Sequence, residues 1–228
     1  MYMYLDRYYL VLILPALIIS IFAQMKVKST FDKYQKVLSK RGVTAKEVVR
    51  KILDASGLTN VRIEQVSGHL TDHFDPRANV IRLSDSVYNS SSVASIGVAA
   101  HEAGHAVQHA VGYVPIKLRN LVFPVASFGS RLAMPLVLLG IIMSFGVLVD
   151  FGIVLFAATT LFQVVTLPVE FNASKRAIAV LDDGFLESDE LKGAKAVLKS
   201  AALTYVAATL TSLAQLLRLI LISKNRRR

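Results

Sequence analysis

The stretch AAHEAGHAVQHAVG, residues Ala99–Gly112, contains three histidines at intervals of four residues: His101, His105 and His109. Side chains four residues apart share one face of a helix, because four residues make slightly more than one turn. The neighbouring residues are mostly alanine and glycine, which lets other segments pack closely against this face. We therefore expect a helix, capped by the serines at 90–92 and ended by Gly112, that presents histidines to a metal ion.

Residues 101–105 of this stretch, HEAGH, form an H-E-x-x-H sequence. Two histidines in this pattern can bind one Zn²⁺ at about 2.0–2.1 Å when they lie on a helix. Glu102 would then lie beside a water on the zinc, where it can take a proton as the water attacks a peptide carbonyl. The five residues also occur by chance in helices without a metal, so a third ligand is needed to support a zinc site.

His109 is a poor third ligand. It lies about 12 Å along the helix axis from His101 and about 80° around it, so one zinc cannot reach both. A different zinc pattern, H-E-x-x-H-x-x-G-x-x-H, requires a glycine at position 108 and a histidine at position 111. This chain has Gln108 and Val111. We therefore expect His109 to pack against neighbouring residues rather than to bind the metal.

Glu170 is the better candidate for the third ligand. The chain has no cysteine, so zinc must take histidine and carboxylate ligands. Glu170 lies 65 residues after His105, where the chain returns from two apolar segments. The alternative is an ordinary acidic residue near the start of a helix, where the helix dipole favours a negative charge.

Long apolar segments indicate a membrane protein. The 228 residues are 54% hydrophobic, more than is usual for a soluble domain. We expect a membrane anchor at 8–23, a transmembrane helical hairpin at 121–168 and a C-terminal membrane helix at 201–223. A polar domain with the HEAGH helix occupies 29–118, and a helix at 169–200 carries Glu170.

The polar domain is expected to contain both helices and strands. Thr44 and Glu47 form a capping box that starts a helix through Leu53. Alternating polar and apolar residues predict strands within Gly57–Val66 and at Val80–Leu83. The segment Asn79–Ser84 is either an edge strand that pairs with an extended substrate or a plain sheet strand, and the sequence does not decide between these.

Several residues could assist the chemistry. His69 and His73 lie in a turn-rich stretch, where surface or turn-stabilising roles are more common than contact with a metal. The negatively charged oxygen that forms on the peptide carbonyl during hydrolysis (the oxyanion) also needs a hydrogen-bond donor. The sequence offers four candidates and does not distinguish among them. These candidates are Arg176, Tyr205, His69 and His73.

The formal net charge of +10 does not indicate nucleic-acid binding, because the basic residues flank apolar segments and no nucleic-acid-binding motif accompanies them. This distribution predicts an integral protein of the cell membrane with its active site on the cytoplasmic side. The basic tail at 224–228 disagrees with that orientation if the last helix crosses the membrane. The expected partners are membrane lipids and a protein or peptide substrate. The sequence does not predict the oligomeric state.

Four long phrases of the sequence resemble a known family: LTDHFDPRANVIRLSDSVY (70–88), SVASIGVAAHEAGHAVQ (92–108), LPVEFNASKRA (167–177) and AALTYVAATLTSLAQLLRLI (201–220). They are similar to the YugP-type neutral zinc metallopeptidases, membrane gluzincins distantly related to HtpX. The resemblance covers nearly the whole chain and implies a mainly α-helical membrane protein in which 29–118 is a small α+β zincin-like domain.

The resemblance also implies the site. His101, His105 and Glu170 match the zinc ligands of this family, and Glu102 matches its catalytic acid and base. In HtpX-like proteins the residue four positions after the ligand glutamate is acidic and orients a histidine. Here that residue is Ser174, so the support of the histidines must differ.

The predicted function is therefore a zinc-dependent membrane endopeptidase that uses Glu102 as general base and then as general acid. The alternative is a membrane scaffold or adaptor that keeps a structural zinc and cleaves nothing. Glu102 favours the enzyme, because a structural zinc site has no use for it and closes its fourth position.

Overall fold

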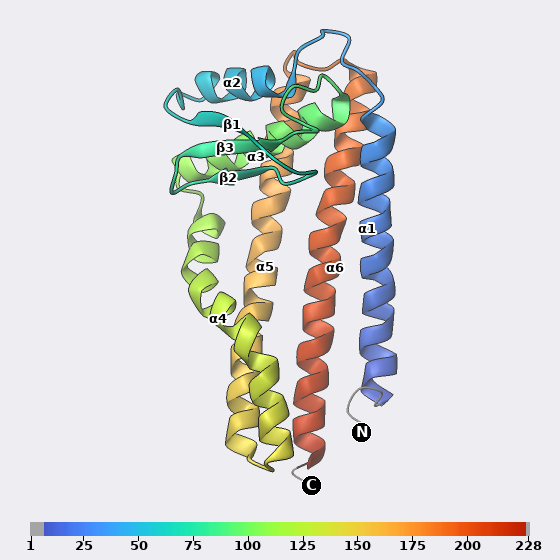
Figure 1. Ribbon diagram of the computed structural model, residues 1–228, viewed down its shortest axis with the longest axis vertical. Coiled ribbons are helices and arrows are strands. Elements are labelled where there is room, and N and C mark those ends of the chain that lie inside the picture. The colour runs from blue at the N-terminus through green and yellow to red at the C-terminus, as the bar shows by residue number, and fades with distance from the viewer. Residues whose placement is uncertain (1–6, 227–228) are drawn as a thin grey trace. The chain divides into compact units, whose positions relative to one another are not determined.

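The computed structural model describes residues 7–226, so Arg227 and Arg228 of the basic tail lie outside the described residues. In the described residues, six α-helices and three short strands follow a π-helical turn. Figure 1 labels the α-helices and the strands. In chain order they are η1 (Tyr9–Ile13), α1 (Leu14–Tyr34), α2 (Ala45–Ala55), β1 (Arg62–Val66), β2 (His73–Asp75), β3 (Val80–Ser84), α3 (Val93–Ala110), α4 (Val114–Ile142), α5 (Gly146–Asp182) and α6 (Ser188–Arg226).

The chain divides into two compact units. Unit 1 comprises Met1–Gln24, Lys117–Pro168 and Thr204–Arg228, and unit 2 comprises Met25–Ile116 and Val169–Leu203. Helices α1, α5 and α6 contribute residues to both units. The three side chains of the candidate metal site, His101, His105 and Glu170, all belong to unit 2.

Four helical segments in the described part of the chain are long and apolar enough to cross a membrane: Tyr9–Tyr34, Val114–Ile142, Gly146–Asp182 and Ser188–Asn225. Their length and composition support the predicted membrane protein, and the predominance of helix confirms the expected fold class.

Unit 1 is held together by close contacts between helices. The backbone carbonyl of Ala133 would lie 2.8 Å from a Cβ added at Gly152, so α4 and α5 approach closely there. Across α5 and α6, the hydroxyls of Thr160 and Ser212 are hydrogen-bonded at 2.8 Å. Small residues and interhelical hydroxyl contacts of this kind are typical of helix packing in membranes.

Unit 2 has a conventional apolar core. It combines side chains of α2, β3 and α3 with residues of α5 and α6, and Phe31, Val49, Leu83, Ile96 and Leu181 are among its buried members. The capping box predicted for α2 is present, because the carboxylate of Glu47 accepts a hydrogen bond of 2.8 Å from the backbone N–H of Thr44.

The sheet has the strand order β1-β3-β2. Strand β1 pairs with β3 in parallel, and β2 pairs with β3 antiparallel, with Phe74 opposite Ile81. The segment Asn79–Ser84 is therefore not an edge strand, because β3 has a neighbour on each side. Of the two interpretations of this segment, the edge strand is wrong and the plain sheet strand is confirmed, because the turn-rich residues His73–Asp75 form the strand β2 beside it.

Helix α5 continues through the expected boundary at Pro168. Proline removes one backbone hydrogen bond, but a break in the helix would leave several polar backbone groups without partners in an apolar environment.

The segment 169–200 was expected to be one helix but consists of the end of α5 and the start of α6. Gly184, with φ of 104°, lies in the turn after α5, and the carboxylate of Glu190 accepts a hydrogen bond from the backbone N–H of Glu187 just before α6.

Candidate metal centre

Helix α3 places the H-E-x-x-H residues in a well-defined position. The side chain of Ser92 accepts a hydrogen bond from the backbone N–H of Ser95, which caps the helix as expected. Gly112, with φ of 62°, follows the helix at its C-terminal end. The alanines on the inner face of α3 are buried in the core of unit 2, so the opposite face presents the two histidines.

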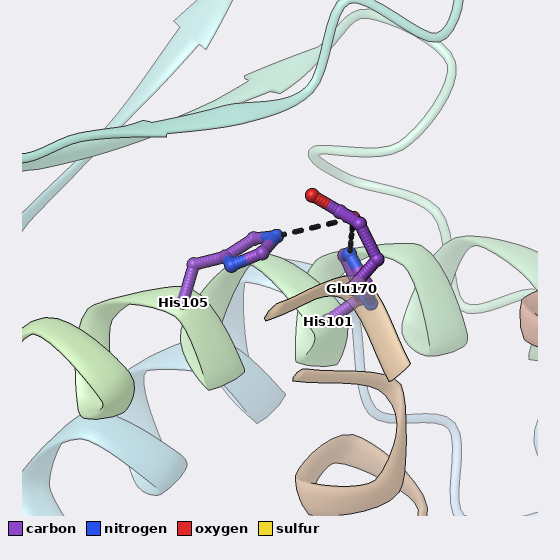
Figure 2. Close-up of side chains that lie close together, drawn as sticks. All are labelled: His101, His105 and Glu170. Carbon is purple, nitrogen blue, oxygen red and sulfur yellow. Dashed lines mark hydrogen bonds and ion pairs between the residues drawn. The ribbon is translucent and has the colours of Figure 1, made fainter. Parts of the chain in front are cut away.

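Three side chains from two helices meet at one point (Figure 2). His101 and His105 extend from α3, and Glu170 extends from α5. One ligand atom from each side chain lies within 4.8 Å of the others. The Nε2 atoms of His101 and His105 lie 3.3 Å and 3.6 Å from the same carboxylate oxygen, Oε2 of Glu170. The structure thus brings together the three residues that the sequence identified as ligand candidates.

These distances fit a zinc ion. Two ligand atoms bound at 2.0–2.1 Å with a tetrahedral angle between them lie about 3.3 Å apart. The two separations of 3.3 Å and 3.6 Å from Oε2 of Glu170 are close to that value. Two imidazoles and a carboxylate are also a ligand set that zinc accepts in hydrolytic enzymes.

The site is partly open to solvent. The side chains of His101 and His105 are 14% and 13% exposed, whereas the side chain of Glu170 is 4% exposed. A structural zinc site is closed by four protein ligands, but a catalytic site leaves one position for water or substrate. Three ligands with two accessible imidazoles therefore correspond to the open kind of site.

Gly104 allows the two helices to meet. A Cβ added at Gly104 would lie 2.8 Å from the backbone carbonyl oxygen of Ala173, which is closer than real Cβ contacts. Ala173 is three residues after Glu170, so this contact brings the ligand-bearing turn of α5 against α3. Glycine is therefore required at position 104 for the packing of α3 against α5, independently of metal binding.

His101 is supported by a hydroxyl. The Oγ of Ser174 lies 3.1 Å from Nδ1 of His101, on the side of the ring away from Glu170. Ser174 is the residue four positions after Glu170, where HtpX-like proteins have an acidic residue. The position therefore still contacts a histidine, but with a neutral group instead of a carboxylate.

His105 is supported by an amide that is itself held on two sides. Nδ1 of His105 lies 3.0 Å from Oε1 of Gln108, a fully buried residue. The Nε2 group of Gln108 donates to the carbonyl of Val169 at 2.8 Å and to Oδ1 of Asn172 at 3.0 Å. Because both of these acceptors contact the NH₂ group of Gln108, the amide oxygen of Gln108 must face His105. The imidazole therefore carries its N–H on Nδ1, and Nε2 is left as the atom that can bind a metal.

The pKa of His105 is raised above its ordinary value. Burial by itself lowers the pKa, but the hydrogen bond to Glu170 and the negative charges of Glu102 and Glu170 outweigh that effect. The two nearby carboxylates thus make the site electronegative, which favours a positive charge at this position.

Glu102 is held by the edge of the sheet. Its Oε2 accepts a hydrogen bond of 3.0 Å from the backbone N–H of Phe74 in β2. Glu102 is only 9% exposed, and its neighbour in the chain is the ligand candidate His101. A backbone donor at this place holds the carboxylate beside the metal position without neutralising its charge.

The remaining histidines lie outside the cluster. The ring of His109 packs against Phe74 with the ring centres 5.9 Å apart, as expected for a packed residue. The ring of His69 packs against Phe31 at 5.5 Å, and Nδ1 of His73 lies 2.8 Å from the carbonyl oxygen of Thr71. These contacts agree with packing and turn-stabilising roles.

Three of the four oxyanion candidates, His69, His73 and Arg176, contact residues other than the ligand candidates. The Nε of Arg176 donates to Asn172 at 2.9 Å, so this arginine supports the residues behind His105. Tyr205 belongs to unit 1. The supporting residues Gln108, Asn172 and Phe74 were not singled out for this role from the sequence, although Gln108, three residues after His105, could have been found by its helical spacing.

Comparison with known proteins agrees with this geometry. Residues 9–224 match the family model described as "Putative neutral zinc metallopeptidase". The chain is 48% identical over 220 residues to "Putative membrane protease YugP" of Bacillus subtilis (strain 168). The aligned residues cover 96% of this chain and 98% of that protein. No solved structure matches. The chain therefore belongs to the family described as "Putative neutral zinc metallopeptidase", which its sequence phrases resembled.

Proposed function

We propose that this protein is a zinc-dependent membrane endopeptidase in which His101, His105 and Glu170 hold Zn²⁺ and Glu102 is the general base and acid. The observation that carries the proposal is the meeting of the three side chains at ligand spacing, with two imidazoles still accessible. The family membership supports the same reaction class.

The residues divide the chemistry among them. Zinc, when bound, acidifies a water molecule and polarises the peptide carbonyl. Glu102 takes the proton of the attacking water and passes it to the nitrogen of the departing amine, so that the peptide C–N bond breaks without a free amide anion. Gln108 and Ser174 contact Nδ1 of the two imidazoles, so that both Nε2 atoms face Oε2 of Glu170, where these residues would hold the ion.

Strand β2 is the part of the sheet that fits an extended substrate. It pairs with β3 on one side, and the backbone N–H of Phe74 on its other side reaches Glu102. A substrate backbone that added to this outer edge would lie beside the general base. We therefore assign substrate pairing to β2, in place of the segment Asn79–Ser84.

The test compares three purified proteins in mild detergent: wild type, Glu102→Gln and His101→Ala. We expect one zinc per chain in the wild type and in Glu102→Gln, and cleavage of an unfolded protein such as casein by the wild type alone. The Glu102→Gln variant should lose at least about 100-fold in rate, because the proton acceptor is missing while the metal stays. Equal cleavage by Glu102→Gln and wild type would refute the proposed mechanism.

The second candidate is a zinc-containing membrane scaffold that cleaves nothing. The favouring observation is that the same three ligands could serve a structural ion. A cell in which Glu102→Gln fully replaces the wild-type protein, with zinc retained, would support the scaffold. Loss of the cellular phenotype with retained zinc would support the peptidase.

We further propose that the protein lies in the cell membrane with the metal site on the cytoplasmic side. The support is the group of lysines that follows the first apolar segment, Lys26, Lys28, Lys33 and Lys36. The chain has no cysteine, so a Lys51→Cys variant carries one exposed thiol in unit 2. A membrane-impermeant maleimide should label it in opened cells and leave it unlabelled in intact cells, and labelling in intact cells would reverse the orientation.

A further inference from the structure

Within unit 2, helices α1 and α6 form an open cavity whose lining includes three lysines and none of the residues of the metal centre. Its volume is about 410 Å³. Lys26, Thr30, Lys33 and Tyr34 line it from α1, and Ala196, Lys199, Ser200 and Leu203 line it from α6. We propose that this cavity binds the phosphate group of an anionic phospholipid.

The spacing of the lining residues shows one face of each helix turned toward the cavity. Lys26, Thr30 and Lys33 follow one another at intervals of four and three residues on α1, and the α6 residues follow the same rule. At Gly193 the two helices touch, because an added Cβ would lie 2.6 Å from the ring of Tyr34. The short side chains of Ala196 and Ser200, one and two turns further along α6, leave room for a ligand.

The cavity holds positive charge without a counter-charge. Three of its lining residues are lysines and none is acidic. Within the described residues 7–226, Lys26, Lys33 and Lys199 form no ion pair with a carboxylate. Lys40 in the same unit, by contrast, lies 2.8 Å from Glu187 and 3.1 Å from Asp189. A phosphate group would supply the missing negative charge.

Two hydroxyls lie at the cavity in addition to the lysines. Thr30 is 8% exposed, and its hydroxyl has no hydrogen-bond partner within the described part of the chain, so it is free to donate to a phosphate oxygen. Ser200 is 5% exposed and donates to the carbonyl of Val197 at 2.8 Å. Nearly buried hydroxyls together with three ammonium groups make a more defined site than lysines spread over a surface.

Helix length indicates that a lipid phosphate can reach these residues. The segment Tyr9–Tyr34 has 26 residues, which rise about 39 Å as a helix. The hydrocarbon layer is about 30 Å thick, so about the last six residues extend into the headgroup region. Lys26 lies one turn deeper, where a lysine side chain can extend toward the phosphates. On α6, Lys199 is the last charged residue before an apolar stretch that begins at Ala201.

The test uses two triple variants with equal loss of charge. One removes the cavity lysines (Lys26→Gln, Lys33→Gln and Lys199→Gln), and the matched control removes exposed lysines of the same region that do not line the cavity (Lys28→Gln, Lys36→Gln and Lys195→Gln). Delipidated proteins in neutral detergent receive dioleoylphosphatidylglycerol, dioleoylphosphatidylcholine or potassium phosphate. Native mass spectrometry counts retained lipids, and thermal unfolding reports the affinity. A Thr30→Val variant tests the hydroxyl with nearly unchanged side-chain shape.

We expect wild type and control to retain and be stabilised by phosphatidylglycerol, with at least about tenfold weaker binding in the cavity variant. Thr30→Val should weaken binding by a smaller factor. Stabilisation by phosphatidylglycerol without an effect of inorganic phosphate supports the lipid as the ligand. If inorganic phosphate stabilises equally well, the lipid assignment is overturned. Equal losses in the two triple variants, or equal binding of phosphatidylcholine, would overturn the cavity as a specific site.

Discussion

The two parts of α5 place their polar side chains in different surroundings. In the part that belongs to unit 1, the hydroxyls of Thr159, Thr160 and Thr166 each donate to the carbonyl four residues earlier in the same helix. In the part that belongs to unit 2, Glu170, Asn172 and Ser174 contact polar side chains of α3. The first kind of residue bonds to its own helix, and Thr159 and Thr160 also reach another helix of unit 1, whereas the second kind supports the candidate metal centre.

This difference teaches where substitutions should matter. A hydroxyl that is satisfied by its own helix can be removed with little consequence elsewhere. A side chain that holds a ligand residue in place affects metal affinity when it is removed, by about 10- to 100-fold in known metal sites.

Gly104→Ala should have the largest effect among residues that are not ligands or the base. The new Cβ would meet the carbonyl oxygen of Ala173 at 2.8 Å, so α5 must move away and carry Glu170 with it. We expect about 100-fold weaker zinc binding, measured by competition with a chromophoric chelator. Gly97→Ala on the same helix is the control, because its Cβ would make an ordinary contact of 3.5 Å with Ala194 and should leave zinc affinity unchanged. Equal affinities of both variants would show that the helix contact does not set the site.

Gln108→Leu should weaken zinc binding by about 10- to 100-fold. The variant removes the acceptor of His105 and also the side-chain amide that donates to the carbonyl of Val169. The visible spectrum of the Co²⁺-substituted protein should change as well, because His105 is then free to turn. An unchanged spectrum and affinity would mean that packing alone orients His105.

Ser174→Ala should have a smaller effect, of about three- to tenfold on zinc affinity. The side chain of His101 is 14% exposed, so a water molecule can replace the lost hydroxyl of Ser174. Ser174→Asp, which restores the acidic residue of HtpX-like proteins, should bind zinc at least as tightly as the wild type. A loss in Ser174→Ala as large as in Gln108→Leu would contradict this ranking.

Thr160→Val should have the smallest effect. It removes hydrogen bonds to Phe156 and Ser212 within unit 1, and such contacts in membrane proteins contribute about 0.6 kcal/mol on average. Zinc affinity should stay the same, and the thermal unfolding midpoint should fall by only a few degrees. A measurable change in zinc affinity would show that the hydrogen bonds of α5 in unit 1 influence the metal centre in unit 2.

The sequence predicted those parts of the molecule whose causes are local. Ser92, Gly112 and the capping box of Thr44 and Glu47 are short-range signals, and the structure contains all of them. The juxtaposition of Glu170 with the two histidines was also anticipated, because Glu170 follows the apolar hairpin and the resemblance to the zinc metallopeptidases implies it as the third ligand.

The remaining features depend on contacts between distant segments. Strand β2 has three residues and follows a turn-rich stretch, so only its pairing with β3 defines it. The continuation of α5 through Pro168 is imposed by its apolar length, against the local preference of proline. The support of His105 needs Gln108 and Asn172, which lie on different helices and have no shared sequence pattern.

The most direct test of the central claim is zinc affinity in Glu170→Ala, with Glu187→Ala as a control for the loss of an exposed carboxylate of the same unit. Zinc content and X-ray absorption at the zinc edge should show one ion per chain in the wild type, with two imidazoles and a carboxylate oxygen. We predict that Glu170→Ala weakens zinc binding by at least about 100-fold while Glu187→Ala leaves it unchanged. Wild-type affinity and an unchanged spectrum in Glu170→Ala would contradict the proposed metal centre.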